Sequence, residues 1–179
     1  MPEIEIRPVN PADFSSLRAI EQHSKSDYVW QMDRSIQETQ VTINFREIRL
    51  PRSIRIDNPQ GEEILESQVK KGSGVLSALL GGQVVGYICV EDRVDSQSAW
   101  IRGMAVAERF RQQGIGSALV LASQDWASKR GLRRMVIEMH SKNYPAIRMA
   151  IKLGYEFSGY HDQYYANQDI ALFFSRLLR

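Results

Sequence analysis

The hydrophobic positions of this chain follow two periods, one typical of strands and one typical of helices. Alternating apolar and polar side chains predict strands, and apolar residues three or four positions apart predict helices with one buried face. Residues 24–36 are ambiguous between the two. The pattern predicts strands over residues 4–9, 41–48, 75–80, 84–90, 100–107, 135–140, 155–161 and 169–177, and helices over residues 11–21, 61–71, 115–126 and 143–153.

Glycine and proline mark the ends of several of these elements. Gly81-Gly82 predicts a tight turn that joins two strands into a hairpin. Pro145 suits the first turn of a helix, and Gly131 and Gly154 suit helix ends. No internal repeat interrupts the order of elements. The sequence therefore predicts a mixed α/β fold with helices on both faces of a central sheet.

An apolar strand, a basic turn and two closely spaced glycines come directly before the helix that begins at Ile115. Gly114 and Gly116 let the backbone approach a ligand without interference from a Cβ atom. The first amides of a helix have no intrahelical acceptor and, with the helix dipole, favour a phosphate or pyrophosphate. The segment is not a P-loop, because Gly-Lys-Ser/Thr is absent. An ordinary turn before a helix is the alternative interpretation.

Two motifs carry a family resemblance. Arg111-Gln112-Gln113-Gly114-Ile115-Gly116 matches the Arg/Gln-x-x-Gly-x-Gly/Ala signature of the GNAT superfamily of acyl-CoA-dependent N-acyltransferases. Residues 136–155 resemble its later motif of a strand, an Asn, a short helix and Leu-Gly-Phe/Tyr. The resemblance covers residues 75–179 well and the first 74 poorly. The second half is most similar to ribosomal-protein N-terminal acetyltransferases, and the early region is faintly similar to streptothricin acetyltransferases.

This resemblance implies one N-acetyltransferase domain over residues 1–179, with an acceptor-side region at 1–74 and an acetyl-CoA-binding core at 75–179. In the superfamily, two central strands of a mixed, mostly antiparallel sheet splay apart and hold the pantetheine arm between them. Here those strands would end at Val106 and His140.

An isolated glycine in the first of these strands, Gly103, predicts a bulge. The bulge would direct a backbone amide, that of Met104, at the thioester carbonyl; alternatively the glycine only makes room for a neighbour such as Trp100. The residues expected to bind acetyl-CoA are Met104, Ala105, Val106, Arg109, Arg111, Gln112, Gln113, Gly114, Ile115, Gly116, Ser117 and Asn143.

Three of these residues have a second interpretation. Asn143 resembles the Asn that bonds the pantetheine arm in related sequences, and it also suits a helix cap. Arg109 and Arg111 would supply positive charge to the phosphates, or they are solvated surface residues.

Glu138 is the candidate general base. In the ribosomal-protein acetyltransferases that the chain resembles, a similar Glu precedes the Asn by the same interval and serves as base. Partial burial among apolar neighbours would raise its pKa toward the working range. A salt-bridged strand glutamate is the alternative, and His140, on the same side of the strand, is the rival base.

The chain departs from the family at the general acid. A Tyr that protonates the CoA sulfur usually lies seven residues after the Asn, but here this position is Ala150. Tyr164-Tyr165 resembles the Tyr-Tyr segment that lines the acceptor site in N-terminal acetyltransferases. Tyr164 or Tyr165 is therefore expected to contact the acceptor and to replace the acid, with aromatic packing or protonation by water as alternatives.

The early region contains a ladder of basic residues, Arg46, Arg49, Arg52 and Arg55. Similar Arg-rich segments occur near the acceptor site of streptothricin acetyltransferases. The ladder could equally bind an acidic acceptor or RNA, or keep a solvated edge strand from aggregating.

The amino-acid composition limits the classes of protein to which the chain could belong. The 179 residues are 43% hydrophobic and 25% charged, which indicates a globular domain. A net charge of +2 is too small to indicate nucleic acid, and no apolar run is long enough to span a membrane. The lone Cys89 excludes an internal disulfide and fits a reducing, cytoplasmic location. No metal is expected, and a homodimer is left open.

The expected function is direct transfer of an acetyl group from acetyl-CoA to a primary amine, of a protein or peptide or of a small molecule such as an antibiotic or polyamine. Cys89 lies on a predicted buried face, so no covalent enzyme intermediate is expected. The alternatives are a non-catalytic acetyl-CoA-binding sensor or scaffold and an RNA-binding protein.

Overall fold

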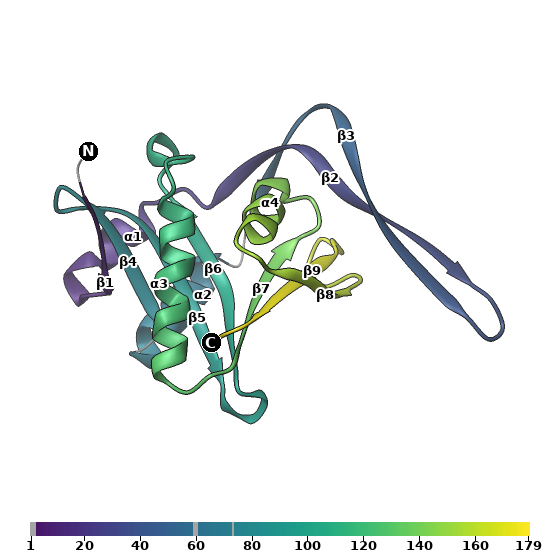
Figure 1. Cartoon of the computed structure of the whole chain (residues 1–179). Coiled ribbons are helices and arrows are strands. Elements are labelled where there is room, and N and C mark those ends of the chain that lie inside the picture. Colours follow the sequence, from purple (N-terminus) through teal and green to yellow (C-terminus); the bar gives the residue numbers. More distant parts are fainter. Residues whose placement is uncertain (1–2, 59–60, 73) are drawn as a thin grey trace.

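The computed structural model describes residues 3–58, 61–72 and 74–179, and within them seven strands form one sheet in the order β1-β4-β5-β6-β7-β9-β8 (Figure 1). Only β6 and β7 pair in parallel among the described strands, so the expected mostly antiparallel sheet is confirmed. The strands are β1 (Ile4–Pro8), β4 (Val75–Leu80), β5 (Gln83–Arg93), β6 (Ser98–Val106), β7 (Arg134–His140), β8 (Glu156–His161) and β9 (Ala171–Leu177).

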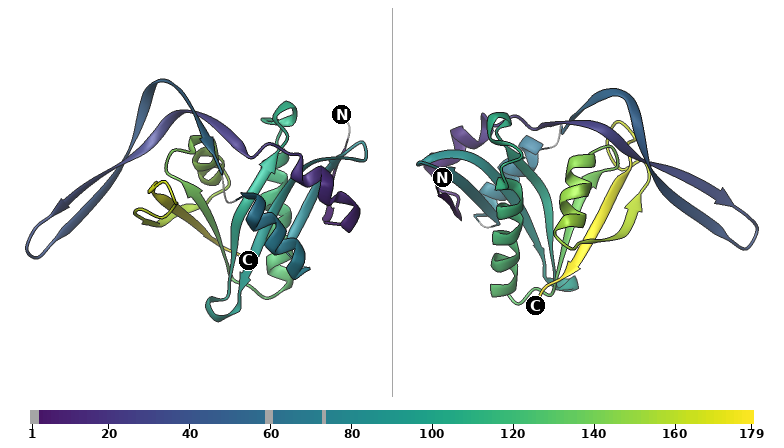
Figure 2. Two further views of the ribbon diagram at one scale, coloured as in Figure 1. Left: turned by 180° about the vertical axis from the view of Figure 1, so that it is seen from behind. Right: turned by 45° about the horizontal axis from the view of Figure 1, so that its top comes forward.

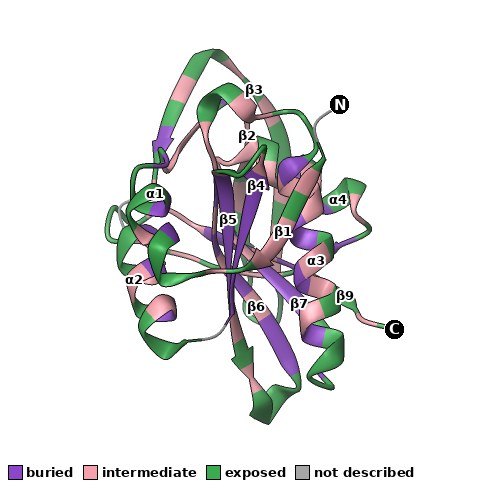
Figure 3. Ribbon diagram, turned by 90° about the vertical axis from the view of Figure 1, so that its left-hand side faces the viewer, coloured by how far each residue is buried: buried purple, intermediate pink, exposed green. Residues whose placement is uncertain are grey.

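Helices cover both faces of this sheet, as predicted. On one face, α1 (Phe14–Arg18) and α2 (Gly61–Lys71) bury Leu17 and Leu65 against Tyr87 and Cys89. On the other face, α3 (Ile115–Lys129) and α4 (Tyr144–Lys152) pack their apolar stripes on the larger core cluster. The buried residues therefore concentrate along the central strands, between two layers of helices (Figure 3).

The first predicted helix is shorter than expected. A 3-10 turn, Pro11–Asp13, precedes α1, which ends at Arg18. The Asp13 carboxylate accepts two hydrogen bonds from Arg7 and one from the Asn10 amide. Side chains as well as backbone therefore hold the turn.

The ambiguous region and the following strand form a long two-stranded arm that is separate from the central sheet. It consists of β2 (His23–Ile36) and β3 (Val41–Asp57), and it projects from the body (Figure 2). The sequence pattern predicted only the first half of β3. The missed half, residues 49–57, contains Pro51 and three exposed arginines, so its apolar alternation is irregular. Ile36 and Val41, which pair at the tip of the arm, are 65% and 62% exposed.

Trp30, in the middle of β2, attaches the arm to the body. Its amide donates to the Ser141 carbonyl at 2.9 Å, and its ring lies 5.5 Å from that of Phe174 and 6.2 Å from that of Phe157. The four arginines of the basic ladder lie on β3 and are exposed, which agrees with the interpretation of a solvated charged strand.

The central strands splay as the sequence predicted. The β6–β7 ladder joins Ser98–Ile101 to Arg134–Ile137 and then stops, so the last part of each strand has no partner in the other. On the other side of β6, the register against β5 shifts between Gly103 and Ile101, which makes Arg102 an extra residue in the strand. The bulge predicted at Gly103 is confirmed, and it lies where the two strands begin to separate.

Candidate active site

The loop that enters α3, residues 111–117, forms a cradle whose free backbone amides are those of residues 112–117. Gln112 and Gly114 both have positive φ angles, of 59° and 83°. The amides of residues 112–117 have no hydrogen-bond acceptor within the part of the chain that the structure describes, and the first bond of the helix is donated by the Ala118 amide to the Gly114 carbonyl. Successive amides in such a conformation, at a helix N-terminus, make a concave site for an anion.

The two glycines of the cradle have different surroundings. A Cβ atom on Gly114 would meet nothing within 4 Å, so this side of the loop is open. A Cβ atom on Gly116 would lie 3.4 Å from Met149 Sδ and 3.6 Å from Met104 Cε. Gly116 therefore faces the space between β6 and α4, where the splayed strand begins.

The two arginines of this segment differ in how they are held. Arg111 donates to the Val106 carbonyl at 2.8 Å and to the Glu21 carbonyl at 3.0 Å, so it ties the loop to the end of β6 and to the segment after α1. Arg109 lies over the Phe110 ring, with 4.7 Å to its centroid. Both arginines therefore provide the positive charge expected for binding a phosphate, and Arg111 also has a structural role.

Glu138 lies just beyond the last β6–β7 pair, and its side chain is only 4% exposed. Arg102 Nε lies 3.4 Å from its carboxylate, and Arg102 Nη1 lies 3.3 Å from Glu91. Burial raises the pKa of Glu138, while Arg102 and a hydrogen bond from Tyr164 oppose this rise. A buried carboxylate whose pKa is raised is a stronger base than an exposed one.

The predicted Tyr164-Tyr165 segment does lie beside Glu138. The amides of Tyr164 and Tyr165 both bond to the Asp169 carbonyl, which folds the loop back toward β7. Burial raises the pKa of both phenols, so both remain protonated. Their rings are perpendicular, with 5.1 Å between centroids, and Tyr164 also packs edge-on against Phe173.

His140 is buried on the same face of β7. Its ring stacks on that of Tyr165, with 3.5 Å between centroids and 5° between planes. Nδ1 lies 3.6 Å from Asp169 Oδ2, and neither ring nitrogen has a hydrogen-bond partner among the described residues. Burial lowers the pKa of the imidazole, so His140 is neutral at pH 7.

Three further predicted positions behave as the sequence indicated. Asn143 caps α4, because its side chain accepts a hydrogen bond from the Ala146 amide at 3.3 Å. Ala150 is fully buried in the α4 interface and provides no acid. Cys89 is buried, and burial raises its pKa to about 12, which excludes a thiolate nucleophile at neutral pH.

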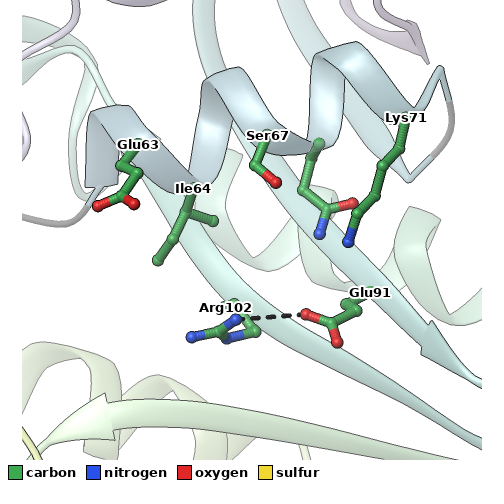
Figure 4. A pocket seen from close by; sticks show the side chains of 7 residues that line it. Glu63, Ile64, Ser67, Lys71, Glu91 and Arg102 are labelled. Carbon is green, nitrogen blue, oxygen red and sulfur yellow. Dashed lines mark hydrogen bonds and ion pairs between the residues drawn. The ribbon is translucent and has the colours of Figure 1, made fainter.

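A cleft of about 290 Å³ lies between α2 and the sheet, next to this cluster (Figure 4). Glu63, Ile64, Ser67, Gln68 and Lys71 line it from α2, and Glu91 and Arg102 line it from β5 and β6. Arg102 is common to the cleft and to the ion pair with Glu138, so the cleft and the cluster around Glu138 are adjacent.

Sequence reasoning missed three charged residues of this site. Arg102, Glu91 and Asp169 each hold a predicted site residue or its partner, but each lies on a different element from the residue that it holds. The only signal was the position of Arg102 beside the predicted bulge, which could have placed it at the splay.

Two properties of the described residues bear on other classes of function. They contain no group of three or more His, Cys, Asp or Glu side chains that could hold a metal ion. None of their helices has the length and hydropathy needed to cross a membrane.

Comparisons with known proteins agree with this geometry. The family model described as "Acetyltransferase (GNAT) family" matches residues 38–155. Streptothricin acetyltransferase from Streptomyces lavendulae is 27% identical over 99 residues, which span 55% of this chain and 52% of that protein. Aminoglycoside N(6')-acetyltransferase type 1 from Salmonella typhimurium is 27% identical over 103 residues, spanning 54% of this chain and 69% of that protein. The chain thus matches about half the length of the first relative.

Several solved structures match nearly the full length of the chain. Nourseothricin acetyltransferase has a TM-score of 0.82 at 19% identity, covering 98% of this chain and 99% of that one. A structure described as a streptothricin acetyltransferase from Bacillus anthracis, in complex with acetyl coenzyme A, has a TM-score of 0.79 at 18% identity over 98% and 99% of the two chains. The ribosomal-protein-S18-alanine N-acetyltransferase from Escherichia coli has a TM-score of 0.67 at 16% identity over 98% and 94%.

Proposed function

The chain belongs to the acetyltransferase (GNAT) family, and we propose that it transfers an acetyl group from acetyl-CoA to the primary amine of a small molecule of the antibiotic or polyamine kind. The single observation that carries this proposal is the run of unpaired amides at residues 112–117 beside two splayed strands. It combines a site for a diphosphate with a slot for an extended chain.

The residues of the cradle fit acetyl-CoA. The amides of residues 112–117 bind the diphosphate, and Arg109 lies close enough along the chain to add positive charge. The free edges of residues 104–106 and of the end of β7 receive the pantetheine arm, and Asn143 contacts it from the start of α4. The bulge at Arg102 turns a backbone amide, that of Met104, toward the thioester carbonyl, which the cosubstrate supplies as the acyl donor.

Glu138 acts as the base for the acceptor. An α-amine with an ordinary pKa of 7.7–8.0 costs about 1 kcal/mol to neutralise at pH 7, and a lysine-like amine with a pKa of 10.4 costs about 4.6 kcal/mol. A carboxylate whose pKa is raised by burial takes this proton more readily than an exposed one. Tyr164, which bonds to Glu138, contacts the acceptor beside it, and Tyr165 lines the same wall.

The acceptor enters through the cleft beside α2. Its volume of about 290 Å³ suits a small-molecule group more than a protein surface. Two carboxylates, of Glu63 and Glu91, and two cations, of Lys71 and Arg102, line the cleft and provide polar partners for an amine-bearing molecule. The names of the relatives, which modify streptothricin and aminoglycosides, support this class of acceptor.

The test is to incubate the protein with acetyl-CoA and each member of a panel of amines, and to measure turnover by the release of free thiol. We expect turnover with streptothricin-class, aminoglycoside or polyamine acceptors. Turnover only with peptides that have a free N-terminal amine would reassign the acceptor to a protein, as the resemblance of the Tyr164-Tyr165 segment suggests. Binding of acetyl-CoA without turnover on any amine would indicate a sensor or scaffold instead.

A further inference from the structure

Two titratable side chains occupy the same face of β7 beyond its last pair with β6. Glu138 and His140 are two residues apart, so they point to one side of the sheet. Glu138 is held by Arg102 and by Tyr164. His140 is 7% exposed, yet both ring nitrogens lack a hydrogen-bond partner among the described residues. Buried polar atoms are rarely left without a partner, and a catalytic role is one explanation for such an atom.

The groups around His140 orient its ring. Asp169 Oδ2 lies 3.6 Å from Nδ1, and the Asp169 carboxylate is itself held by Lys142 Nζ at 2.6 Å and by Asn167 at 2.9 Å. A carboxylate on this side favours the tautomer with the proton on Nδ1, which leaves the lone pair on Nε2. Tyr165, stacked flat on the ring, fixes its plane.

The charged groups that act on His140 are Asp169 and Lys142, and Tyr165 is the titratable group stacked on it. Burial and Lys142 lower the pKa of the imidazole, and Asp169 raises it. The net effect keeps the ring neutral at pH 7, and a neutral imidazole is able to accept a proton.

The missing acid at Ala150 removes the usual donor of a proton to the sulfur, while the number of protons that the acceptor nitrogen loses stays the same. An acceptor ammonium loses two protons overall before it becomes an amide. When no acid protonates the sulfur, it leaves as a thiolate, which is feasible because a free thiol has an ordinary pKa of about 8.5. Both protons of the acceptor nitrogen then need acceptors within the site.

We propose that His140, oriented by Asp169, is the second proton acceptor of the acetyl transfer and works beside Glu138. Glu138 takes the first proton and frees the amine. As the N–C bond forms, Nε2 of His140 takes the second proton, directly or through one water, and the electron pair of the breaking C–S bond stays on sulfur. The thiolate takes its proton from solvent, and Glu138 and His140 return theirs to solvent. This inference rests on the proposed function.

The first test does not depend on activity. Nitrogen-15 NMR of the full chain would follow its three histidines, His23, His140 and His161, with His140→Gln used for assignment. We expect a neutral ring with the proton on Nδ1 at pH 7, and a titration midpoint that falls further in Asp169→Asn, because Asp169 raises the pKa of His140. A protonated ring at pH 7, or the proton on Nε2, would overturn the proposal.

The second test is kinetic and uses His23→Gln as a matched control, since His23 lies at the start of the arm. We expect His140→Gln to lower kcat/KM for the amine about 100-fold, with less than a twofold change in acetyl-CoA affinity. We also expect added imidazole to restore turnover in His140→Ala, which a purely structural role would not predict. A His140→Gln enzyme within twofold of the wild type, or no rescue, would contradict the role.

The two proposals fail in different ways. A wild-type chain that turns over no amine would remove the proposed function, while the NMR result would still report the tautomer of His140. An active wild type with an unaffected His140→Gln variant would remove the role of His140 alone.

Discussion

Arg102 reaches Glu138 across the point where β6 and β7 separate, with 3.4 Å between Nε and Oε2. It does so because the bulge places Arg102 as an extra residue in β6, with its side chain on the face that carries Glu138. Burial raises the pKa of Glu138 and Arg102 lowers it. The protonation of the proposed base therefore depends on a residue of the neighbouring strand.

Replacing Arg102 should move the acid limb of the pH profile. Glu138 works as a base only when it is ionised, so kcat/KM falls as the pH drops through its pKa. Arg102→Met removes the cation that lowers this pKa, and the limb should shift to higher pH. In Glu138→Gln this limb should disappear, and turnover should fall most at pH values above the limb, where Glu138 of the wild type is ionised. The measurement is kcat/KM between pH 5 and 9, and an unmoved limb in Arg102→Met would contradict the coupling.

The two tyrosines of the acceptor loop provide a matched pair. Tyr164 donates a hydrogen bond that lowers the pKa of Glu138, whereas Tyr165 is not among the main groups that shift this pKa. Tyr164→Phe should therefore move the acid limb to higher pH, and Tyr165→Phe should leave its position unchanged while altering the KM for the amine. The same pH series measures both variants. Equal shifts in the two would mean that the loop acts on Glu138 through packing alone.

Much of this site was predictable because its chemistry is local in sequence. The cradle at 111–117, the bulge at Gly103 and the cap at Asn143 each depend on neighbouring residues, and the geometry of all three is confirmed. Arg102, Glu91 and Asp169 were not predictable in the same way, because each acts on a residue far away in the chain.

The arm was the largest gap in the fold prediction, for a physical reason. Strand patterns are readable when one face is buried, but most residues of β2 and β3 are exposed or half-buried. Three aromatic residues of the arm, Tyr28, Trp30 and Phe45, pack on the body. The apolar alternation therefore marks residues 41–48, which include Phe45, and fades over residues 49–57, which contain Pro51 and three exposed arginines.

The contact of Trp30 with the body should contribute more to the stability of the protein than the tip of the arm does. Removing the ring of a half-buried aromatic costs less than the 3–5 kcal/mol of a fully buried one, so Trp30→Ala should destabilise the protein by about 2–3 kcal/mol. Ile36→Ser at the exposed tip is the control and should stay within about 0.5 kcal/mol. Denaturant unfolding measures both. Similar losses in the two variants would mean that the tip is covered in solution.

Cys89 should be dispensable for turnover. It is buried against α2, and burial raises its pKa to about 12, so the thiolate is scarce at pH 7. Cys89→Ala should keep kcat within about twofold, at a stability cost of about 1 kcal/mol for the small cavity. The native chain should also react slowly with a thiol reagent until it is unfolded. A variant without activity, or an acetylated cysteine found by mass spectrometry, would point to a covalent intermediate.

Gly114 gives the sharpest test of the cradle, because the chain contains a glycine with the same strain and no expected ligand. Gly114 and Gly82 have φ angles of 83° and 79°, and a Cβ atom at either would meet nothing within 4 Å. Valine at either position should therefore destabilise the backbone similarly, by about 1–2 kcal/mol. Only Gly114→Val should also lose acetyl-CoA affinity, by tenfold or more, since its side chain occupies the approach to the free amides at 112–117. Calorimetry with acetyl-CoA and thermal unfolding of both variants separate the two effects. Unchanged affinity in Gly114→Val would place the diphosphate elsewhere and remove the basis of the proposed function.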